Sequence, residues 1–437
     1  MNMLDYKLTK FENGLKVITA PLSNTKAVSV FVLVKTGSRF EKEEENGIAH
    51  FLEHMFFKGT KKRPKSVDIA RELDSVGASY NAFTGEEYTG FYVRVESSHF
   101  DLGLDILQDI LYNSLFGKDE IAKEKGVILE EINMIKDLPA AYVEYVMKEL
   151  LYGSKPLGRM ITGTRETVSK FSRDDIESFK KRFYQPENMI VAVAGGNDPS
   201  TGSGQANWLE KIKNKFGEIE KLKPEGFEKI EESQTKPELK IFNKATDQAH
   251  FILGFRSIKR TDERRPILKV LNNILGATMS SRLFSEVREK RGLCYYISSD
   301  IADFQDTGFW GVGAGVDIKR IAEAIKVILE EFGKIRKEEV SDEELKRAQD
   351  NLKGHLYLGL EESMAVAQFL AEQEMFWEKI DDPDQVVSDF QKVTKSDIKK
   401  LASDLFRKEK LNLAVVGPFE RDSPAGEEFQ KILERYR

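Results

Sequence analysis

A helix-strand unit occurs twice in this chain. The copies read SRDDIESFKKRFYQPENMIVAVAG and TKSDIKKLASDLFRKEKLNLAVVG. The step from Ile176 to the closing Gly195 is 19 residues in the first copy. In the second copy the step from Ile398 to Gly417 has the same length. Each copy opens with a hydroxyl residue that can cap a helix, continues as an amphipathic helix and ends in an apolar strand. These shared features favour duplication over chance, so we expect two related domains.

The domain boundaries follow from the segment between the two copies. Residues 217–237 are rich in Glu and Lys, contain two prolines and lack a regular apolar period, which is typical of a linker. The 437 residues also suit two domains of about 200 residues each. We predict a first domain over 1–216, a linker over 217–237 and a second domain over 238–437. A Gly/Ser-rich segment at 195–208 is expected to form a surface loop.

Strand signals come before helix signals in the first half of the chain. Asn13-Gly14 is a hairpin turn signal, and VSVFVLV at 28–34 is apolar enough to be a buried strand. Helical periodicity then dominates, interrupted by a strand pair around 80–84 and 88–95. This mixture predicts an α+β fold. With the duplication, we expect two homologous α/β-sandwich domains, each a mainly antiparallel sheet packed with helices.

Charge and composition exclude several classes of protein. The 67 basic and 73 acidic residues leave a formal charge of −6 without a long run of one sign, which argues against a nucleic-acid partner. The N-terminal residues lack the apolar core of a signal peptide, and no uncharged run approaches the roughly 18 residues of a membrane helix. We therefore expect a soluble, cytoplasmic protein with no membrane partner. A single cysteine, Cys294, excludes an internal disulfide and a Cys-rich zinc module, so a metal site would need His and carboxylate ligands.

The motif HFLEH carries the strongest chemical signal. On a helix, residues i, i+3 and i+4 share one face, so His50, Glu53 and His54 point the same way. Two neutral imidazoles can bind Zn²⁺, and a carboxylate beside the ion can take a proton from a metal-bound water. An ordinary amphipathic helix could also carry two histidines, but the chain has only five, and H-x-x-E-H is a known zinc-peptidase signature. We predict one zinc ion per chain, with Glu53 as the general base.

A third protein ligand is needed, and the other histidines are scattered, so a carboxylate is the better candidate. In DEIAKEKGVILEEINMI, one helical stripe consists of Glu124, Ile128, Glu131 and Ile135. A carboxylate in an apolar stripe needs a partner. We therefore predict Glu131 as the ligand and Glu124 as a group that orients one imidazole. Glu130 points about 100° away and is interpreted as surface charge, although it stays the alternative ligand.

The chain resembles a known family over nearly its whole length. HFLEHMFFKGT, NAFTGEEYTGFY and EKEKGVILEEI are similar to segments of the pitrilysin-type (inverzincin) zinc metallopeptidases. The length suits half-size members such as the β subunit of the mitochondrial processing peptidase. The resemblance implies that His50, His54 and Glu131 bind zinc. It also implies that Glu53 is the general base and that Glu124, seven residues before the third ligand, supports the site.

The resemblance also implies a contribution from the second half of the chain. EVREKRGLCYYISS is similar to a segment that supplies an Arg/Tyr pair in this family, which corresponds to Arg288 and Tyr295. A phenol hydroxyl can hydrogen-bond a developing oxyanion, which gives the tyrosine a physical use. Without the resemblance, the two residues would be interpreted as a solvated helix charge and an ordinary strand aromatic.

A substrate-binding strand is the last feature that the resemblance implies. SYNAFT is similar to the edge strand on which these peptidases bind extended peptides, so contacts are expected at Asn81, Ala82 and Phe83. Phe57 matches an apolar subsite residue of the processing peptidase. Core packing is the ordinary alternative for both phenylalanines. Residues 139–141 read PAA where the processing peptidase carries acidic residues, so we expect no preference for an arginine near the cut.

These features together predict a zinc-dependent endopeptidase that hydrolyses oligopeptides or unfolded polypeptide segments with a metal-activated water. Since each chain has one metal motif and two related halves, we expect a homodimer whose other partner is the peptide substrate. Two alternatives remain. A non-catalytic assembly subunit of the same fold is disfavoured by the intact HFLEH motif. A zinc hydrolase of a non-peptide bond is compatible with the same motif.

Overall fold

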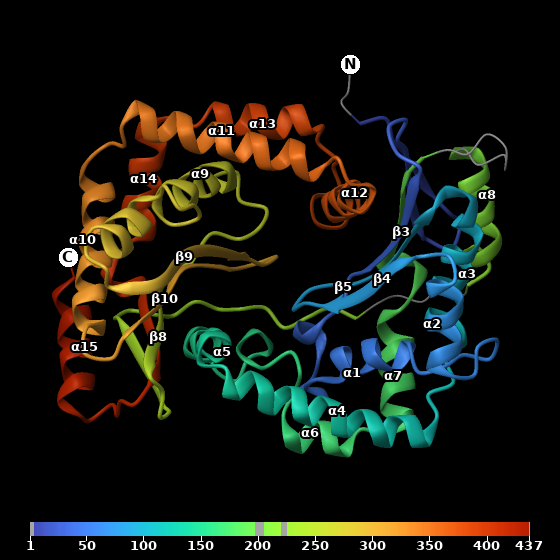
Figure 1. The fold of residues 1–437 in the computed structure, drawn as a ribbon, viewed down its shortest axis with the longest axis horizontal. Helices are drawn as coiled ribbons and strands as arrows, with labels where there is room; N and C mark the ends of the chain where they lie inside the picture. Colours follow the sequence, from blue (N-terminus) through green and yellow to red (C-terminus); the bar gives the residue numbers. More distant parts are fainter. Residues whose placement is uncertain (1–3, 197–204, 220–224, 437) are drawn as a thin grey trace. The chain divides into compact units, whose positions relative to one another are not determined.

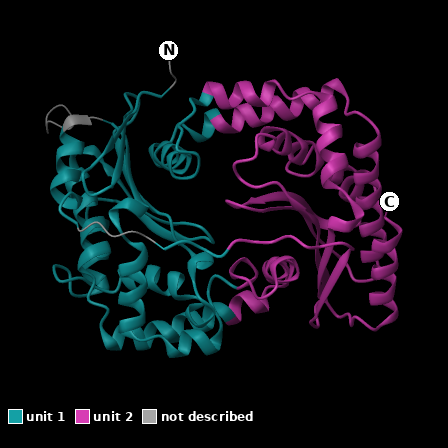
Figure 2. Ribbon diagram, turned by 180° about the vertical axis from the view of Figure 1, so that it is seen from behind, with its two compact units in different colours: residues 1–132, 160–228, 357–383 teal, residues 133–159, 229–356, 384–437 magenta. Residues whose placement is uncertain are grey.

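The computed structural model describes residues 4–196, 205–219 and 225–436 (Figure 1). Parts of the loop predicted at 195–208 and of the predicted linker therefore lie outside the described residues. The chain forms two compact units (Figure 2). Unit 1 contains residues 1–132, 160–228 and 357–383, and unit 2 contains residues 133–159, 229–356 and 384–437. Each unit is a mixed sheet packed with helices, which confirms the predicted α+β fold class.

Unit 1 is built on a six-stranded sheet with the order β1-β2-β6-β3-β5-β4. Its strands are β1 (Lys7–Lys10), β2 (Lys16–Pro21), β3 (Ala27–Val34), β4 (Ser79–Thr84), β5 (Thr89–Glu96) and β6 (Met189–Gly195). β2 and β6 are parallel, and the other neighbours are antiparallel. The predicted hairpin turn joins β1 to β2, with Gly14 at a φ of +93°. Such a φ favours glycine, which is why Asn-Gly is a turn signal.

Helices cover both faces of this sheet. The helices that unit 1 contributes are α1 (Ile48–Phe56), α2 (Ser66–Asp74), α3 (Phe100–Asn113), most of α4 (Lys118–Asp137), α6 (Arg165–Lys170), α7 (Arg173–Phe183), α8 (Gln205–Phe216) and α12 (Ser363–Trp377). On β3, Val30 and Val32 belong to the main core, whereas Ser29 on the opposite face shares a 2.8 Å hydrogen bond with Ser363 of α12. Because both faces are covered, β3 is apolar at every position except Ser29.

Unit 2 is built on a five-stranded sheet with the order β7-β11-β8-β10-β9. Its strands are β7 (Glu238–Asn243), β8 (Gln248–Ser257), β9 (Cys294–Asp303), β10 (Gly308–Asp317) and β11 (Leu411–Gly417). Its helices are α5 (Pro139–Tyr152), α9 (Arg265–Leu275), α10 (Ile321–Lys337), most of α11 (Asp342–Gly359), most of α13 (Pro383–Gln391), α14 (Lys395–Leu405) and α15 (Pro424–Arg435). The helices α9, α10, α14 and α15 pack with the sheet in the main core of the unit.

The two sheets have the same topology apart from β1. β7, β11, β8, β10 and β9 follow one another across the sheet as β2, β6, β3, β5 and β4 do, and the pair β7/β11 is parallel like β2/β6. Both copies of the repeated sequence form the expected helix and strand, α7 with β6 and α14 with β11. The first-turn backbone N–H groups are capped by Ser172 and Thr394, respectively. The repeat therefore builds corresponding parts of the two sheets.

Each unit also takes one helix from the other half of the sequence. α5, from the first half, packs on β11, β8 and β7 of unit 2, and α12, from the second half, packs on β3, β6 and β2 of unit 1. The compact units therefore interleave along the chain. The boundaries of these units differ from those of the predicted domains 1–216 and 238–437. The two domains were predicted from the sequence duplication and stay a prediction.

The described part of the predicted linker contains neither helix nor strand. Within unit 1, the Arg39 guanidinium lies 3.9 Å from the centroid of the Phe227 ring and donates to the Glu228 carbonyl. Within unit 2, the Thr307 hydroxyl donates to the Glu232 carboxylate at 2.6 Å. Side-chain contacts rather than sheet pairing thus attach this segment to the units.

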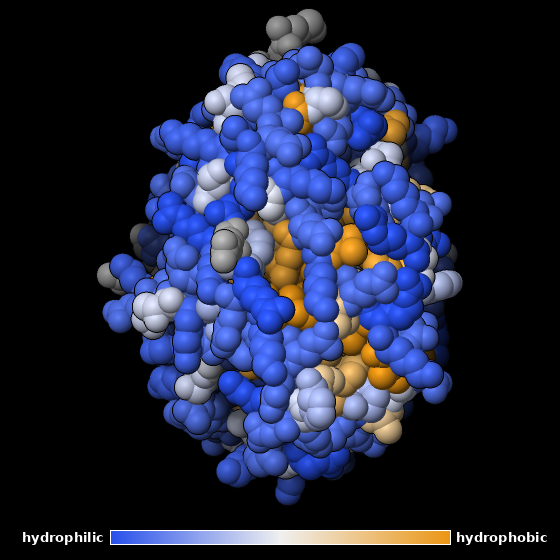
Figure 3. Space-filling model, turned by 90° about the vertical axis from the view of Figure 1, so that its left-hand side faces the viewer, coloured by the Kyte–Doolittle hydropathy of each residue, from blue (hydrophilic) through white to orange (hydrophobic). Residues whose placement is uncertain are grey.

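Hydrophilic side chains dominate the face of the molecule in Figure 3, and apolar residues gather near its middle between them. Apolar atoms contribute a large share of any protein surface, so this patch alone indicates no partner. In the part of the chain that the structure describes, no helix has both the length and the apolar character needed to cross a bilayer.

Candidate metal centre

The helix α1 carries the H-x-x-E-H motif, and two residues determine where it begins. Gly47 precedes it with a φ of +97°, and a Cβ there would lie 2.7 Å from the carbonyl oxygen of Thr162, so only glycine fits. The Glu41 carboxylate is 3% exposed and accepts the backbone N–H groups of Gly47 and Ala49 at 2.8 and 2.9 Å. An acidic group on these otherwise unpaired N–H groups stabilises the start of a helix. The helix thus begins at Ile48, directly after this glycine.

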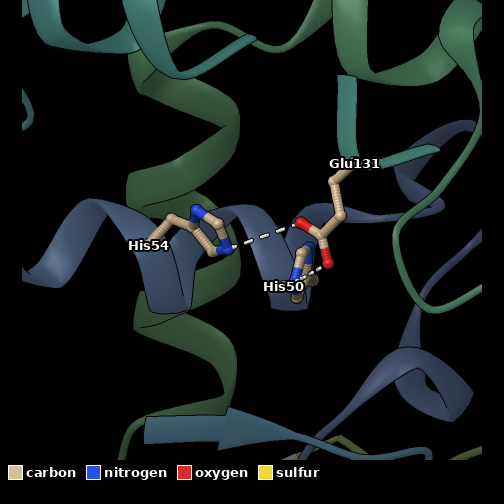
Figure 4. Close-up of side chains that lie close together, drawn as sticks. All are labelled: His50, His54 and Glu131. Atoms are coloured by element: carbon tan, nitrogen blue, oxygen red, sulfur yellow. Dashed lines mark ion pairs between the residues drawn. The ribbon is translucent and has the colours of Figure 1, made fainter. Parts of the chain in front are cut away.

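His50, His54 and Glu131 lie together, and each offers one ligand atom within 4.8 Å of the others (Figure 4). Both imidazoles project from α1, and the carboxylate comes from α4. Nε2 of His50 lies 3.7 Å from Oε1 of Glu131, and Nε2 of His54 lies 3.8 Å from Oε2. The structure brings the three predicted ligands together. Glu130 is exposed and lies outside this cluster.

The spacing of these atoms fits a metal site better than a hydrogen-bonded cluster. Hydrogen bonds between N and O are about 2.7–3.2 Å long. Two atoms bound to zinc at about 2.0–2.2 Å in tetrahedral geometry lie about 3.3–3.5 Å apart. The distances of 3.7 and 3.8 Å are therefore too long for hydrogen bonds and close to the spacing of zinc ligands. Two imidazoles and one carboxylate are also a ligand set of catalytic zinc sites, which keep a fourth position open.

Glu124 holds one of the imidazoles in place. Its Oε1 lies 2.7 Å from Nδ1 of His54, and its Oε2 accepts from Nζ of Lys58 at 2.7 Å. The contact at Nδ1 leaves Nε2 of His54 directed towards Glu131. A carboxylate on the second nitrogen of a ligating imidazole fixes its orientation and raises its basicity. Glu124 thus lies where its predicted role requires, whereas Lys58 was not predicted.

Burial and nearby charges set the protonation of the cluster. Burial lowers the pKa of His50 to about 3, which keeps that imidazole neutral. Burial also lowers the pKa of His54, but its hydrogen bond with Glu124 and the surrounding carboxylates outweigh this effect, so the net pKa is raised. Burial raises the pKa of Glu131. The carboxylates that favour a proton on His54 equally favour a divalent cation, because both bring positive charge.

Glu53 lies on the same helix and has a separate partner. Its carboxylate accepts a hydrogen bond from Oγ1 of Thr84, on β4, at 2.6 Å. Burial raises the pKa of Glu53, and the bond from Thr84 opposes that shift. A carboxylate whose pKa is raised is better matched to proton transfer near neutral pH. Thr84 was not predicted, because only the fold places β4 beside α1.

A cavity of about 280 Å³ opens beside the cluster. It is lined by Glu53 and His54 together with Phe57, Ile69 and Tyr80. Phe57 therefore borders the site, as the resemblance implies, and it also packs on the core of unit 1. Ile69 and Tyr80 were not predicted. Their patterns are those of ordinary helix and strand residues, so the sequence contains no signal that distinguishes them.

β4 is an edge strand of its sheet, and among the described residues it pairs with β5 alone. The free edge of such a strand can pair with an added peptide through main-chain hydrogen bonds. Asn81 is exposed, and Ala82 belongs to the core of unit 1. Phe83 stacks on Phe31 with ring centroids 6.3 Å apart. Because Ala82 and Phe83 already pack within the unit, a peptide would meet chiefly their backbone.

Arg288 and Tyr295 belong to unit 2, whereas the His-His-Glu cluster belongs to unit 1. Arg288 lies in η7 (Phe284–Glu289), a π-helical turn, with its guanidinium 4.7 Å from the Phe284 ring centroid. π-Helical turns are frequent at functional sites. Tyr295, on β9, is 76% exposed, so its ring does little packing. The roles of both residues at the metal site stay predictions.

Fold and cluster together define a class of protein: two related α+β units, with a metal-type His-His-Glu cluster on one of them. Comparison with known proteins identifies the family. The family described as Insulinase (Peptidase family M16) matches residues 16–165, and the Peptidase M16 inactive domain matches residues 170–352. The chain is 35% identical to an uncharacterized zinc protease of Streptomyces coelicolor, over 94% of this chain and 89% of that protein. It belongs to peptidase family M16, which confirms the resemblance stated from the sequence.

Other relatives and solved structures agree with this assignment. The chain is 34% identical to the uncharacterized zinc protease YmxG of Bacillus subtilis, over 93% of this chain and 97% of that protein. The fold is similar to the crystal structure of a protease from Helicobacter pylori, with a TM-score of 0.88 and 24% identity over 95% of this chain and all of that one. It is also similar to a peptidase M16 inactive domain from Pseudomonas fluorescens, with a TM-score of 0.85 and 19% identity over 96% of this chain and all of that one.

Proposed function

We propose that the protein is a zinc-dependent endopeptidase that hydrolyses oligopeptides or unfolded polypeptide segments. The observation that carries this proposal is the convergence of His50, His54 and Glu131 beside Glu53. Relatives that are named zinc proteases match the chain over more than nine-tenths of its length, which supports the same class of activity. One such cluster in the described residues of each chain supports one zinc ion per chain.

The residues of the chain have distinct tasks in this proposal. Zinc bound by the cluster would polarise the scissile carbonyl and lower the pKa of a bound water. Glu53 takes the proton of the attacking water and delivers it to the leaving amine, while Thr84 holds the Glu53 carboxylate in place. Glu124 keeps the ligating nitrogen of His54 directed towards the cluster. The accuracy of this placement matters because proton transfer requires contact within hydrogen-bond distance.

Substrate binding is assigned to the elements beside the cluster. We expect an extended peptide to pair with the free edge of β4 at Asn81, Ala82 and Phe83, because such pairing depends little on sequence. The cavity beside Phe57 would take one side chain of the peptide.

The proposal assigns supporting roles to two residues of unit 2. Tyr295 would donate a hydrogen bond to the oxyanion, and Arg288 would bind the substrate near the same group. The 76% exposure of Tyr295 leaves its hydroxyl accessible for this purpose. Since an oxyanion donor acts in the transition state, Tyr295→Phe should lower kcat far more than it changes KM. Unchanged kinetics would remove this residue from the mechanism.

The decisive experiment is digestion of a mixed peptide library, read by mass spectrometry, with and without a chelator. The wild-type protein should cleave peptides only when zinc is present. Glu53→Gln should lower cleavage at least about 10³-fold and still bind close to one zinc per chain, since it removes the base and keeps the ligands. Retained cleavage in this variant would exclude Glu53 as the base.

The same experiment separates the alternatives. Zinc-loaded protein that cleaves no peptide would instead be a non-catalytic assembly subunit or a hydrolase of a non-peptide bond. The description of the 170–352 match as an inactive domain concerns the half of the chain without the metal motif. We also propose a homodimer, because each chain carries two related halves and one metal cluster. Light scattering that gives a monomer mass would contradict this part.

A further inference from the structure

Unit 2 contains a second cavity, of about 350 Å³, lined by residues to which the proposed function assigns no role. α5 forms one wall, and the outward-facing side chains of β9 form the other. The wall of α5 is apolar, because Val143, Met147 and Leu151 line it and are each less than 5% exposed. The volume lies within the roughly 300–1,000 Å³ range of small-molecule sites, which are mostly apolar with a few polar groups.

Gly311 and Gly313 of β10 line this cavity, together with Ile252 of β8. Gly311, Gly313 and Gly315 alternate with Val312 and Ala314, which point into the main core of unit 2. The glycines therefore occupy the opposite face of the sheet. On this face, β10 carries no side chain between Phe309 and Asp317.

Two of the three glycines are explained by packing. A Cβ at Gly311 would lie 2.3 Å from the ring of Phe309, and a Cβ at Gly315 would lie 2.5 Å from the ring of Tyr296. Each ring thus lies directly over one glycine. Substituting either glycine would displace an aromatic side chain.

Gly313 lies between these two rings, and no packed side chain explains why this residue is a glycine. A Cβ added there would meet a single atom within 4 Å, Cγ1 of Ile252 at 3.9 Å. A glycine in the interior of a strand weakens it, and it often marks a place where a ligand or another backbone approaches closely. The chain thus leaves an interior strand of the sheet without a side chain at Gly313, where a Cβ would have space.

The polar groups around the cavity indicate the charge of its occupant. Asp300 and Ser298 are exposed residues of β9 that line it, and Glu144 and Lys148 line it from α5. The carboxylate of Asp300 has no ion pair or hydrogen bond within the described ranges of the chain. Two carboxylates and one ammonium group leave the rim with a net negative charge, which favours a cation over an anion.

We propose that the cavity between α5 and the glycines of β10 binds a slender apolar molecule that carries a positively charged group. The aliphatic or aromatic body lies over Gly313 between the rings of Phe309 and Tyr296. The charged group lies at the rim beside Asp300. This site is built from residues of unit 2, whereas the His-His-Glu cluster belongs to unit 1.

Binding can be measured with N-phenyl-1-naphthylamine, a neutral apolar dye whose fluorescence rises in an apolar site. The full-length protein should bind it saturably at one site per chain. Decyltrimethylammonium should displace the dye at a concentration at least about fivefold lower than decanoate, which has a similar chain and the opposite charge. The absence of saturable binding, or equal displacement by the two compounds, would overturn the proposal.

Substitutions locate the site. Gly313→Val fills part of the cavity with a residue that favours strands, so it should weaken dye binding at least about tenfold while the unfolding temperature stays the same or rises. Gly313→Ala adds one methyl group and should have a smaller effect in the same direction. If Gly313→Val folds poorly, the alanine variant still decides. Dye binding unchanged in the well-folded variant would overturn the proposal.

The charge of the rim has its own test. Asp300→Asn should reduce the preference for decyltrimethylammonium over decanoate. Glu330→Gln, on the exposed side of α10 in the same unit, removes an equal charge away from the cavity and should leave the preference unchanged. Equal effects of the two variants would show that the preference reflects net charge alone and would overturn the placement of the charged group at Asp300.

Discussion

The sheets of unit 1 and unit 2 have the same topology apart from β1. The helix that follows β3 in unit 1 and the helix that follows β8 in unit 2 have different roles. In unit 1, α1 follows β3 and presents His50 and His54 to Glu131. In unit 2, α9 follows the corresponding strand β8, and its Asn272 accepts hydrogen bonds from Trp310 Nε1 at 2.8 Å and from Ser299 Oγ at 2.6 Å. One helix carries groups suited to chemistry, and the other supplies a buried polar network.

This difference shows that the duplicated architecture is a scaffold, while function depends on side chains placed on it. The sheets need the same apolar faces whether or not a unit binds metal. A metal-type cluster needs a few particular residues on elements that the topology already brings together. The loss or gain of a site in one unit therefore leaves the fold of that unit intact.

The largest effect should come from comparing a histidine of each unit. His54→Ala removes a predicted ligand, so zinc binding should be lost and kcat/KM should fall at least about 10³-fold. His250→Ala removes a histidine of unit 2 whose Nδ1 lies 2.9 Å from the Tyr296 hydroxyl, and it should retain zinc and activity. Metal analysis and peptide cleavage measure both. Equal loss in the two variants would contradict the assignment of the chemistry to unit 1.

The next largest effect should come from Glu124, the residue that orients a ligand of the predicted metal cluster. Glu124→Gln weakens the hydrogen bond at Nδ1 of His54, so the affinity for zinc should fall about 10–100-fold. Glu120→Gln on the same helix is the control, because that carboxylate pairs with Lys123 on an exposed surface. Competition with a chromogenic chelator gives both affinities. If the two variants bind zinc equally well, Glu124 has no orienting role.

The network of unit 2 should matter for stability and leave metal binding unchanged. Asn272→Ala leaves the buried Trp310 N–H without its partner and leaves the buried Ser299 hydroxyl only a long contact, of 3.4 Å, with the carbonyl oxygen of residue 272. The free energy of unfolding of unit 2 should fall by about 2–4 kcal/mol, because buried groups without hydrogen bonds are costly. Denaturant unfolding followed by tryptophan fluorescence measures this loss. A variant of wild-type stability would show that the network is dispensable.

The smallest effect should be the same in both units. Ser172→Ala and Thr394→Ala remove the caps of α7 and α14, whose oxygens accept the N–H groups of Asp175 and Asp397 at 3.3 and 3.2 Å. Each substitution should cost about 1 kcal/mol of folding stability. Calorimetry of both variants tests whether the repeated units are energetically equivalent. Clearly unequal losses would show that the two helix starts have diverged in more than sequence.

Features encoded within short segments could be predicted from the sequence. The motif on α1 depends on helical periodicity alone, which places His50 and His54 on one side. Glu131 could be selected over Glu130 because a carboxylate within an apolar stripe faces inwards, and the structure places Glu131 in the cluster and Glu130 at the surface. The apolar segment at 28–34 likewise indicated a buried strand, which the structure has as part of β3.

Features that depend on contacts between distant segments could not be predicted. Glu41 caps α1 from outside the helix, and Thr84 reaches Glu53 from a strand about thirty residues later. Neither residue belongs to a periodic pattern that would identify it. The exchange of α5 and α12 between the halves also has no local signal, because an amphipathic helix does not specify which sheet it covers.

The sequence alone predicted the kinds of elements, their repetition and the candidate metal ligands, because each of these is encoded by spacing along a few turns or strands. The tertiary structure alone decided which carboxylate forms a hydrogen bond with which imidazole. It also decided which residues line the two cavities and that space is open at Gly313. These depend on atoms from separate segments coming within a few ångströms of one another, and such distances are set by packing rather than by local pattern.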